Sequence, residues 1–329
     1  MQYLELKPKT GWVTPLQADT IFGHLCWKIV HKDGEEVLEG FLENMANSPI
    51  FVLSNVFPKD FIPKPVIPDL DLNSLDQEDF SDKEGYLKEK EKEKNFSKQV
   101  KFIKLTEVDK LLSDQKIKEK LVKKYTDFSE SSDSVKINLS SKKEMKNKVN
   151  RLTGSTEDDS LFNLEPKFYF KNEDISNLWL LLRVFDSEKF EKYNIKERLQ
   201  DVFREGYGKK KNVGKGNFES LGWSDDIEDF DEGGRALILS NFVPSAEDPT
   251  KGTYRTFMKY GKLGAERSTA GSGNFHKKPI LMLKEGAYFR ANTNLKNDKY
   301  LGKIFTPDDE VSYDYDIYHY AFGLPIFFS

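Results

Sequence analysis

The chain has very little thiol and imidazole chemistry. Its 329 residues include one cysteine, Cys26, so no disulfide can form within the chain and no thiolate cluster can hold a metal. A single free thiol is typical of a reducing, intracellular setting. There are only four histidines, which leaves few candidates for a catalytic base or a metal ligand.

Long hydrophobic runs and a strong excess of one charge are also missing. No apolar segment reaches the ~20 residues that a membrane-spanning helix needs, and residues 1–10 lack the apolar core of a signal peptide. We therefore expect a soluble, cytoplasmic protein with no membrane partner. Because the net charge is only −4, any nucleic-acid surface must come from local clusters of basic residues.

What is present is an ordinary supply of core residues in an alternating pattern. Helical spacing is predicted at residues 20–31, 35–45 and 190–204. Short strands are predicted at residues 2–6, 50–56, 161–170, 179–185, 217–222, 235–242, 280–284, 287–292 and 324–328. A Glu-Gly turn is predicted to join the strands at 280–284 and 287–292. This order predicts an α+β fold with two tandem ferredoxin-like, RRM-like units of βαββαβ order.

Charged residues are distributed unevenly along the chain. Lys, Glu, Asp and Ser dominate about residues 69–156, and such a stretch cannot bury enough apolar surface for a core of its own. We interpret it as a charged insertion in a first domain of residues 1–223. The acidic residues 224–234 are predicted to be a linker, and residues 235–329 to be a second domain.

The most informative motif is GYGKKKNVGKGNF at residues 206–218. Its four glycines permit positive φ and close approach of a ligand, and its four lysines without an acid create a positive field. It is not a P-loop, because five residues separate Gly208 from Gly214, and it lacks the third glycine of a dinucleotide fingerprint at Lys211. A nucleic-acid backbone is the predicted ligand, and a mobile basic turn is the alternative.

A second basic stretch covers residues 142–156. The guanidinium of Arg151 can fork onto a phosphate, and the polar side chains of Asn150, Thr153, Ser155 and Thr156 can contact phosphate or sugar. The alternative is a solvated hairpin that closes the charged insertion.

Catalytic and metal sites have weaker support. His24 could act as a base in RNA cleavage, but the sequence places no catalytic partner beside it. The acidic segment around Asp229 fails as an EF-hand loop, because Ser240 stands where the last glutamate ligand belongs. We expect no metal and no cofactor.

In this order, the motifs resemble those of RAMP proteins of CRISPR systems, and most of all the fourth Csm subunit of type III-A effector complexes. The resemblance rests on residues 18–24, residues 150–156 and the loop at 206–218, with further matches at 239–244, 259–262, 281–289 and 324–328. It implies two ferredoxin-like domains with an inserted thumb in the first. It also implies an RNA-binding subunit that holds the 5′ tag of the CRISPR RNA. The implied partners are the large polymerase-like Csm subunit and the backbone RAMP subunits.

The same resemblance implies a set of RNA-contacting residues and no catalytic ones, because cleavage belongs to neighbouring subunits. These residues are Thr20, His24, Asn150, Arg151, Thr153, Gly154, Thr156, Gly206, Gly208, Lys209, Lys210, Lys211, Gly214, Lys215 and Gly216. Tyr207 and Phe218 are candidates for stacking on bases, and a place in the core is the equal alternative for Phe218. Two alternatives stay open. One is a metal-independent endoribonuclease that processes repeat RNA through His24, and the other is a pure protein-interaction subunit.

Overall fold

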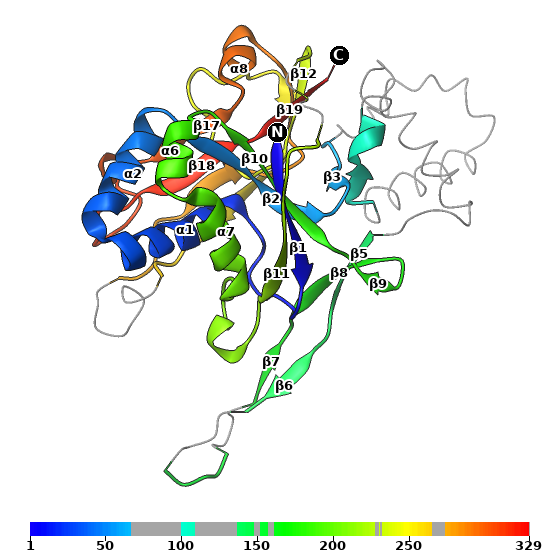
Figure 1. Cartoon of the computed structure of the whole chain (residues 1–329), viewed down its shortest axis with the longest axis vertical. Coiled ribbons are helices and arrows are strands. Elements are labelled where there is room, and N and C mark those ends of the chain that lie inside the picture. Colours follow the sequence, from blue (N-terminus) through cyan, green and yellow to red (C-terminus); the bar gives the residue numbers. More distant parts are fainter. Residues whose placement is uncertain are drawn as a thin grey trace, which may run out of the picture.

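The computed structural model describes residues 1–66, 100–108, 137–147, 152–156, 161–227, 230, 232–264 and 274–328. These residues form an α+β protein in which the strand pairings are antiparallel (Figure 1). The α+β class predicted from the sequence is thus confirmed.

The first sheet has four strands, in the spatial order β11 (Phe218–Ser224), β1 (Gln2–Pro8), β10 (Leu178–Val184) and β2 (Phe51–Pro58). Its helices are α1 (Ala18–Asp33), α2 (Glu35–Asn47), α6 (Ser187–Lys192) and α7 (Ile195–Arg204). Along the chain, α1 and α2 separate β1 from β2, and α6 and α7 separate β10 from β11. Elements in this order, with this neighbour relation, make a βαββαβ unit.

The second sheet repeats the neighbour relation with fewer helices. Its strands lie in the order β13 (Gly252–Thr253), β16 (Tyr288–Arg290), β12 (Arg235–Ile238) and β19 (Pro325–Phe328). The short helix α8 (Thr293–Asp298) follows β16. Two further strand pairs are β14 (Thr256–Lys259) with β15 (Ile280–Leu283), and β17 (Leu301–Phe305) with β18 (His319–Gly323). The turn η5 (Pro307–Asp309) lies between β17 and β18.

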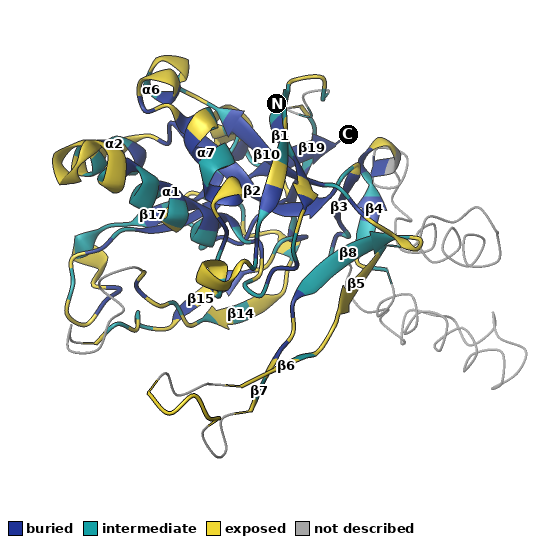
Figure 2. Ribbon diagram, turned by 60° about the horizontal axis from the view of Figure 1, so that its bottom comes forward, coloured by how far each residue is buried: buried dark blue, intermediate teal, exposed yellow. Residues whose placement is uncertain are grey.

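A long two-stranded ribbon projects from this body (Figure 1). Its base pairs β5 (Ile137–Ser141) with β8 (Lys167–Lys171), which is extended by β9 (Asp174–Ile175), and its outer part pairs β6 (Glu144–Lys146) with β7 (Phe162–Leu164). Strands β5 and β6 are largely exposed (Figure 2). The outer part of the ribbon is therefore surrounded by solvent, and its base includes the half-buried strand β8.

The charged insertion also returns apolar residues to the body. Strand β4 (Phe102–Lys104) pairs with β3 (Phe61–Pro63), and the turn η2 (Leu105–Glu107) follows it. Ile103, Leu105 and Val108 are buried in the main hydrophobic core. The sequence analysis treats this stretch as one charged insertion and does not identify the short segment, because three apolar residues carry little weight in the average over a long polar stretch.

Helix α1 shows how the core forms. Ile21, Leu25 and Ile29 recur every four residues, so they share one face of the helix and are fully buried. Burial of each such side chain stabilises the fold by roughly 1.5–3 kcal/mol. The cluster that they join also includes Tyr320 and Phe328 from the end of the chain. Residues on both sides of the predicted linker at 224–234 therefore share one core.

Two predicted elements differ in the structure. The strands at 280–283 and 288–290 do not form a hairpin, because β15 pairs with β14 while β16 pairs with β12 and β13. The helical pattern at 190–204 is split into α6 and α7 by Asn194, whose φ of 47° is left-handed.

Candidate nucleic-acid interface

The glycine-rich loop, residues 206–217, joins α7 to β11 and contains the turn η3 (Lys211–Val213). Its base is closed where the Tyr207 N–H donates to the Gly216 carbonyl at 2.8 Å. The Gly216 N–H donates in turn to the Gly11 carbonyl at 3.0 Å. The loop is thus tied to the segment between β1 and α1 and has a defined shape.

Two glycines of this loop are required by the loop's own packing. Gly208 and Gly216 have left-handed φ values of 74° and 70°. A Cβ at Gly208 would lie 2.5 Å from the Thr14 Cβ, and one at Gly216 would lie 2.2 Å from the Tyr207 carbonyl oxygen. Glycine is therefore needed here for close approach within the chain itself.

His24, on α1, anchors the loop through a hydrogen bond to its backbone. Its Nε2 accepts a hydrogen bond from the Gly208 N–H at 3.0 Å, while the next amide, of Lys209, donates to the Thr14 Oγ1 at 2.8 Å. Burial, together with the positive charges of Lys211 and Lys28, lowers the pKa of His24 to about 4. The imidazole is therefore neutral at neutral pH and acts as an acceptor that positions the loop.

The four lysines of the loop fall into two pairs. Lys209 and Lys211 are exposed to solvent. Lys210 and Lys215 instead contact the ribbon: the Lys210 Nζ lies 4.8 Å from the centre of the Phe162 ring, and the Lys215 Nζ lies 2.7 Å from the Glu144 Oε1. The loop and the ribbon thus form one continuous surface, on which Lys209 and Lys211 point outward.

The tip of the ribbon contains part of the second predicted motif. Leu152 is 97% exposed, Gly154 has a φ of 67°, and the Thr153 and Ser155 hydroxyls lie 2.8 Å apart. Thr156 is exposed as well. Asn150 and Arg151 lie outside the described residues. Thr153, Gly154 and Thr156 therefore belong to a projecting tip rather than to the loop surface.

Thr20 lies on α1, one turn before His24. The Lys259 Nζ reaches its Oγ1 at 3.5 Å and forms an ion pair of 2.8 Å with the neighbouring Asp19 carboxylate. Thr20 is thus at the edge of the loop surface, on the side that faces β14.

The proposed stacking residues are part of the core. Tyr207 is fully buried, and its hydroxyl donates to the Pro15 carbonyl at 2.6 Å. Phe218 is 1% exposed and packs 5.5 Å from Phe203, measured between ring centres. The prediction that these two rings stack on bases is wrong, because neither ring has a free face.

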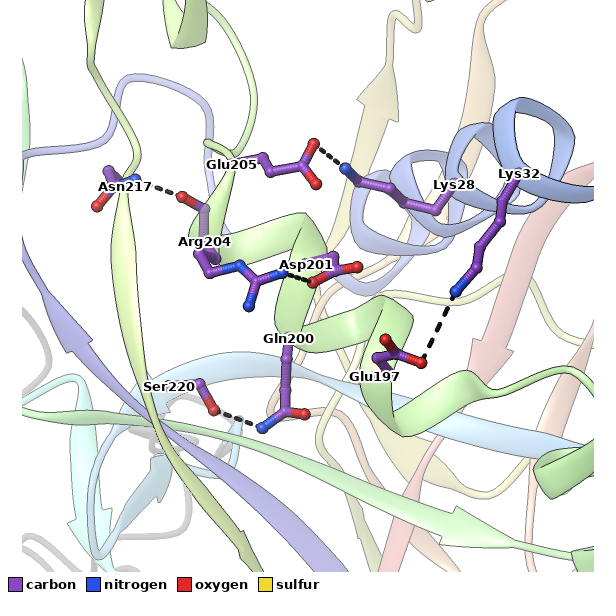
Figure 3. Close-up of polar contacts among 9 residues, drawn as sticks. All are labelled: Lys28, Lys32, Glu197, Gln200, Asp201, Arg204, Glu205, Asn217 and Ser220. Atoms are coloured by element: carbon purple, nitrogen blue, oxygen red, sulfur yellow. Dashed lines mark hydrogen bonds and ion pairs between the residues drawn. The ribbon is translucent and has the colours of Figure 1, made fainter.

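Ion pairs hold α7, and with it the loop, against α1 (Figure 3). Lys28 pairs with Glu205 at the end of α7, and the Lys32 Nζ lies 3.8 Å from the Glu197 carboxylate in the first turn of α7. The Asn217 side chain donates to the Arg204 carbonyl where the loop ends (Figure 3). The helix pair is therefore a fixed base for the loop, and the Lys28 ammonium is already paired with a carboxylate.

Sequence reasoning missed two residues that shape this surface. Thr14 lies 195 positions from Lys209, whose N–H donates to the Thr14 Oγ1, and Glu144 lies 71 positions from Lys215. A local sequence pattern contains no signal for contacts of this separation. Only the folded chain brings them together.

The described part of the chain has neither a membrane-spanning helix nor a cluster of metal ligands. No helix there is long and apolar enough to cross a membrane. No group of three or more His, Cys, Asp or Glu side chains there is arranged to hold a metal ion.

Comparison with known proteins points in one direction. No protein-family model and no curated protein matches the chain. Among solved structures, it resembles a chain of the Csm3–Csm4 subcomplex of the type III-A CRISPR-Cas interference complex, with a TM-score of 0.58, 18% identity and 100% of both chains covered. It also resembles a chain of a Csm1–Csm4 cassette in complex with cA4, with a TM-score of 0.52, 16% identity, and 99% of this chain and 96% of that chain covered. Csm4 is the component that these complexes share, and the chain has the fold of a Csm4-like RAMP protein.

Proposed function

We propose that this chain is a non-catalytic RNA-binding subunit of a type III-A CRISPR interference complex in antiviral defence. One observation supports this above the others. On a Csm4-like fold, the glycine-rich loop packs against the projecting ribbon through Lys210 and Lys215. Next to these contacts it exposes Lys209 and Lys211 to solvent. A rigid, positively charged loop beside a protruding ribbon suits the backbone of a single RNA strand.

The mechanism is electrostatic and geometric. Lys209 and Lys211 bind phosphates without reading bases, which positions the RNA in register. The ribbon, whose tip includes Thr153 and Thr156, lies across the path of a strand held by the loop and bends it. The specific ligand in this proposal is the repeat-derived 5′ tag of the CRISPR RNA.

The partners follow from the same proposal. The similar solved chains occur in complexes named for Csm3 and for Csm1. We infer that this chain docks the large polymerase-like subunit and the backbone RAMP subunits in the same manner. The second sheet, which repeats the strand order of the first with one short helix, is in this view a reduced second ferredoxin-like unit.

The geometry of His24 supports a binding role over a catalytic one. Its Nε2 is occupied by the Gly208 amide, so this nitrogen has no lone pair available to take a proton from an RNA hydroxyl. The endoribonuclease alternative predicts that purified protein cleaves repeat RNA in the presence of a chelator and that His24→Ala abolishes the product. We expect no product from either protein.

The test is affinity purification of the tagged chain from its native host, with sequencing of bound RNA and mass spectrometry of bound proteins. Short RNAs that share one repeat-derived 5′ end, together with a large polymerase-like subunit, are the expected result. Protein free of RNA and of such a partner would leave the fold standing and remove the proposed function.

A further inference from the structure

A second part of the chain combines positive charge with exposed aromatic side chains. We call residues 251–264 and 274–284, which include β14 and β15, the basic hairpin. It contains four Lys or Arg residues in the first segment and three in the second, seven in all, and no Asp or Glu. The whole chain has 55 acidic and 51 basic residues, so this local excess is unusual. Such a patch is the electrostatic sign of a polyanion site.

Two of the seven cations fix the hairpin to the body. Lys259 lies 2.8 Å from the Asp19 carboxylate and 2.6 Å from the Gln17 Oε1, at the start of α1. The Lys277 Nζ lies 3.3 Å from the Nδ1 of His319, on β18, where His319 is buried and Lys277 is half-buried. These two lysines face inward, and the Lys278 Nζ lies 3.5 Å from the Glu310 Oε2. The exposed cations of the hairpin, Lys251, Arg255, Lys262 and Lys284, are therefore the ones available to a ligand.

The opposite face of the hairpin is open to solvent (Figure 2). Met258 and Leu281 are direct cross-strand partners, and their side chains are 44% and 57% exposed. Tyr260, two residues further along the same face, is 72% exposed. An apolar and aromatic strip of this kind on a monomer indicates a binding surface.

Exposed cations flank β14 along the chain, one before the strand and one after it. Arg255 and Lys262 are exposed, and Lys262 also holds its Nζ 5.3 Å from the centre of the Phe275 ring. Beyond them, the Lys278 Nζ lies 5.7 Å from the centre of the Tyr313 ring, which is 56% exposed. Alternating cations and exposed rings are typical of surfaces that bind single-stranded nucleic acid.

The basic hairpin and the glycine-rich loop flank the same end of α1. Lys259 contacts Asp19 and Thr20 in the first turn, and His24, one turn later, accepts from Gly208 of the loop. Between them Gly23 is exposed, and a Cβ there would meet no other atom within 4 Å. An RNA strand that leaves the loop along this helix meets the hairpin next.

We propose that the exposed face of the basic hairpin is a second binding surface for single-stranded RNA. Arg255 and Lys262 contact phosphates, and Tyr260 provides a ring on which a base stacks. This proposal rests on the proposed function, because it extends the path of the RNA that the glycine-rich loop holds. Stacking tolerates every base, so the surface adds affinity and direction rather than sequence specificity.

Charge favours RNA over a protein as the occupant. An apolar protein surface that covered the strip would remove water from Arg255 and Lys262 and offer them no negative charge in return. A single RNA strand pairs those cations with phosphates and offers its bases to the rings.

The experiment measures binding of a fluorescent single-stranded RNA of about 15 nucleotides to the full chain over a series of salt concentrations. Three variants are compared with the wild type: Arg255→Glu with Lys262→Glu, Tyr260→Ala, and Lys209→Glu with Lys211→Glu in the loop. Lys192→Glu with Lys296→Glu, on α6 and α8, is the control for the same change of charge.

We expect the hairpin charge variant to lower the slope of log affinity against log salt by about 1.4, or 0.7 for each lost phosphate contact. Tyr260→Ala should weaken binding about five- to a hundred-fold, and RNA with 4-thiouridine should crosslink to a peptide that contains Tyr260. The control variant should keep the wild-type slope.

The outcomes separate the two proposals. If only the loop variant weakens binding, the hairpin surface is disproved and the proposed function stands. If only the hairpin variants weaken binding, the loop fails as the phosphate grip while the hairpin is upheld. If hairpin variants bind RNA normally but no longer co-purify with a partner protein, the surface is a protein-docking site and the inference is wrong.

Discussion

Most residues of the glycine-rich loop serve the shape of the loop, and only two lysines are left free for a ligand. The amides of Tyr207, Gly208 and Lys209 all donate to other parts of the chain. The glycines, which in the sequence indicate close approach of a ligand, allow the chain to approach itself. The same composition thus serves rigidity first and binding second.

Gly216→Ala is a direct test of that rigidity. The new Cβ would clash with the Tyr207 carbonyl and force an alanine into left-handed φ, so we expect the free energy of unfolding to fall by at least about 2 kcal/mol. Urea unfolding followed by circular dichroism measures it. Gly23→Ala is the matched control: its Cβ would point into open space on α1, and alanine there should be neutral or stabilise by up to about 1 kcal/mol. Equal stability of the two variants would contradict this account of the loop.

Glu144 accepts a hydrogen bond from the Lys215 ammonium, and this contact lowers the pKa of the Glu144 carboxyl. Glu144→Gln should free Lys215 for phosphate and tighten RNA binding about two- to five-fold, in line with the modest strength of ion pairs near the protein surface. Fluorescence anisotropy with single-stranded RNA measures the change.

Glu165→Gln removes the same charge from the same ribbon, where the partner Lys143 lies 3.9 Å away. We expect little change in affinity from it. If both variants tighten binding equally, the effect belongs to net charge and not to the release of Lys215.

At the scale of elements, α1 organises the interface. Its buried face builds the core, His24 holds the glycine-rich loop, and Asp19 holds the basic hairpin. The helix itself was predictable, because its apolar residues recur at helical spacing. The partners of its polar residues were not, because they come from segments far along the chain.

The His24 contact predicts how stability depends on pH. The folded pKa of about 4 lies below the ordinary value of 6.5, so the unfolded chain takes up a proton first as the pH falls. The stabilisation from neutral His24 is complete above pH 6.5 and is lost progressively towards pH 4. Unfolding midpoints in urea should therefore fall less steeply across this range in His24→Gln than in the wild type. His276→Gln, at an exposed position, is the control and should keep the wild-type slope.

Strand pairing shows the limit of sequence reasoning at this scale. The segments at 280–283 and 288–290 are strands, as their residues predict, but the Glu-Gly turn between them does not make a hairpin. Local residues decide that a segment is extended. The choice of partner depends on which distant strand covers its apolar face.

At the scale of the whole molecule, the net charge of −4 conceals two separate basic surfaces. Acidic residues elsewhere on the chain balance them, so overall composition says little about nucleic-acid binding. Function at this scale depends on where the lysines point.

Lys209→Glu with Lys211→Glu tests the loop within the assembled complex. Because both side chains are exposed, the fold should persist while retention of CRISPR RNA falls as salt rises. RNA that co-purifies with the complex is quantified at each salt concentration, with Lys192→Glu plus Lys296→Glu as the charge-matched control. Unchanged retention across the series would count decisively against the loop as a phosphate grip.

The sequence by itself determined the α+β class, the main helices and strands, and the glycine-rich loop as a basic feature, because spacing, glycine and charge are local properties. The tertiary structure alone decided that Tyr207 and Phe218 are core residues and that Lys215 is paired with the ribbon. It also decided that β14 and β15 pair, with Tyr260, Arg255 and Lys262 exposed on the same hairpin. Burial and pairing arise from contacts between distant segments, and the pattern of any one segment contains no record of its partner.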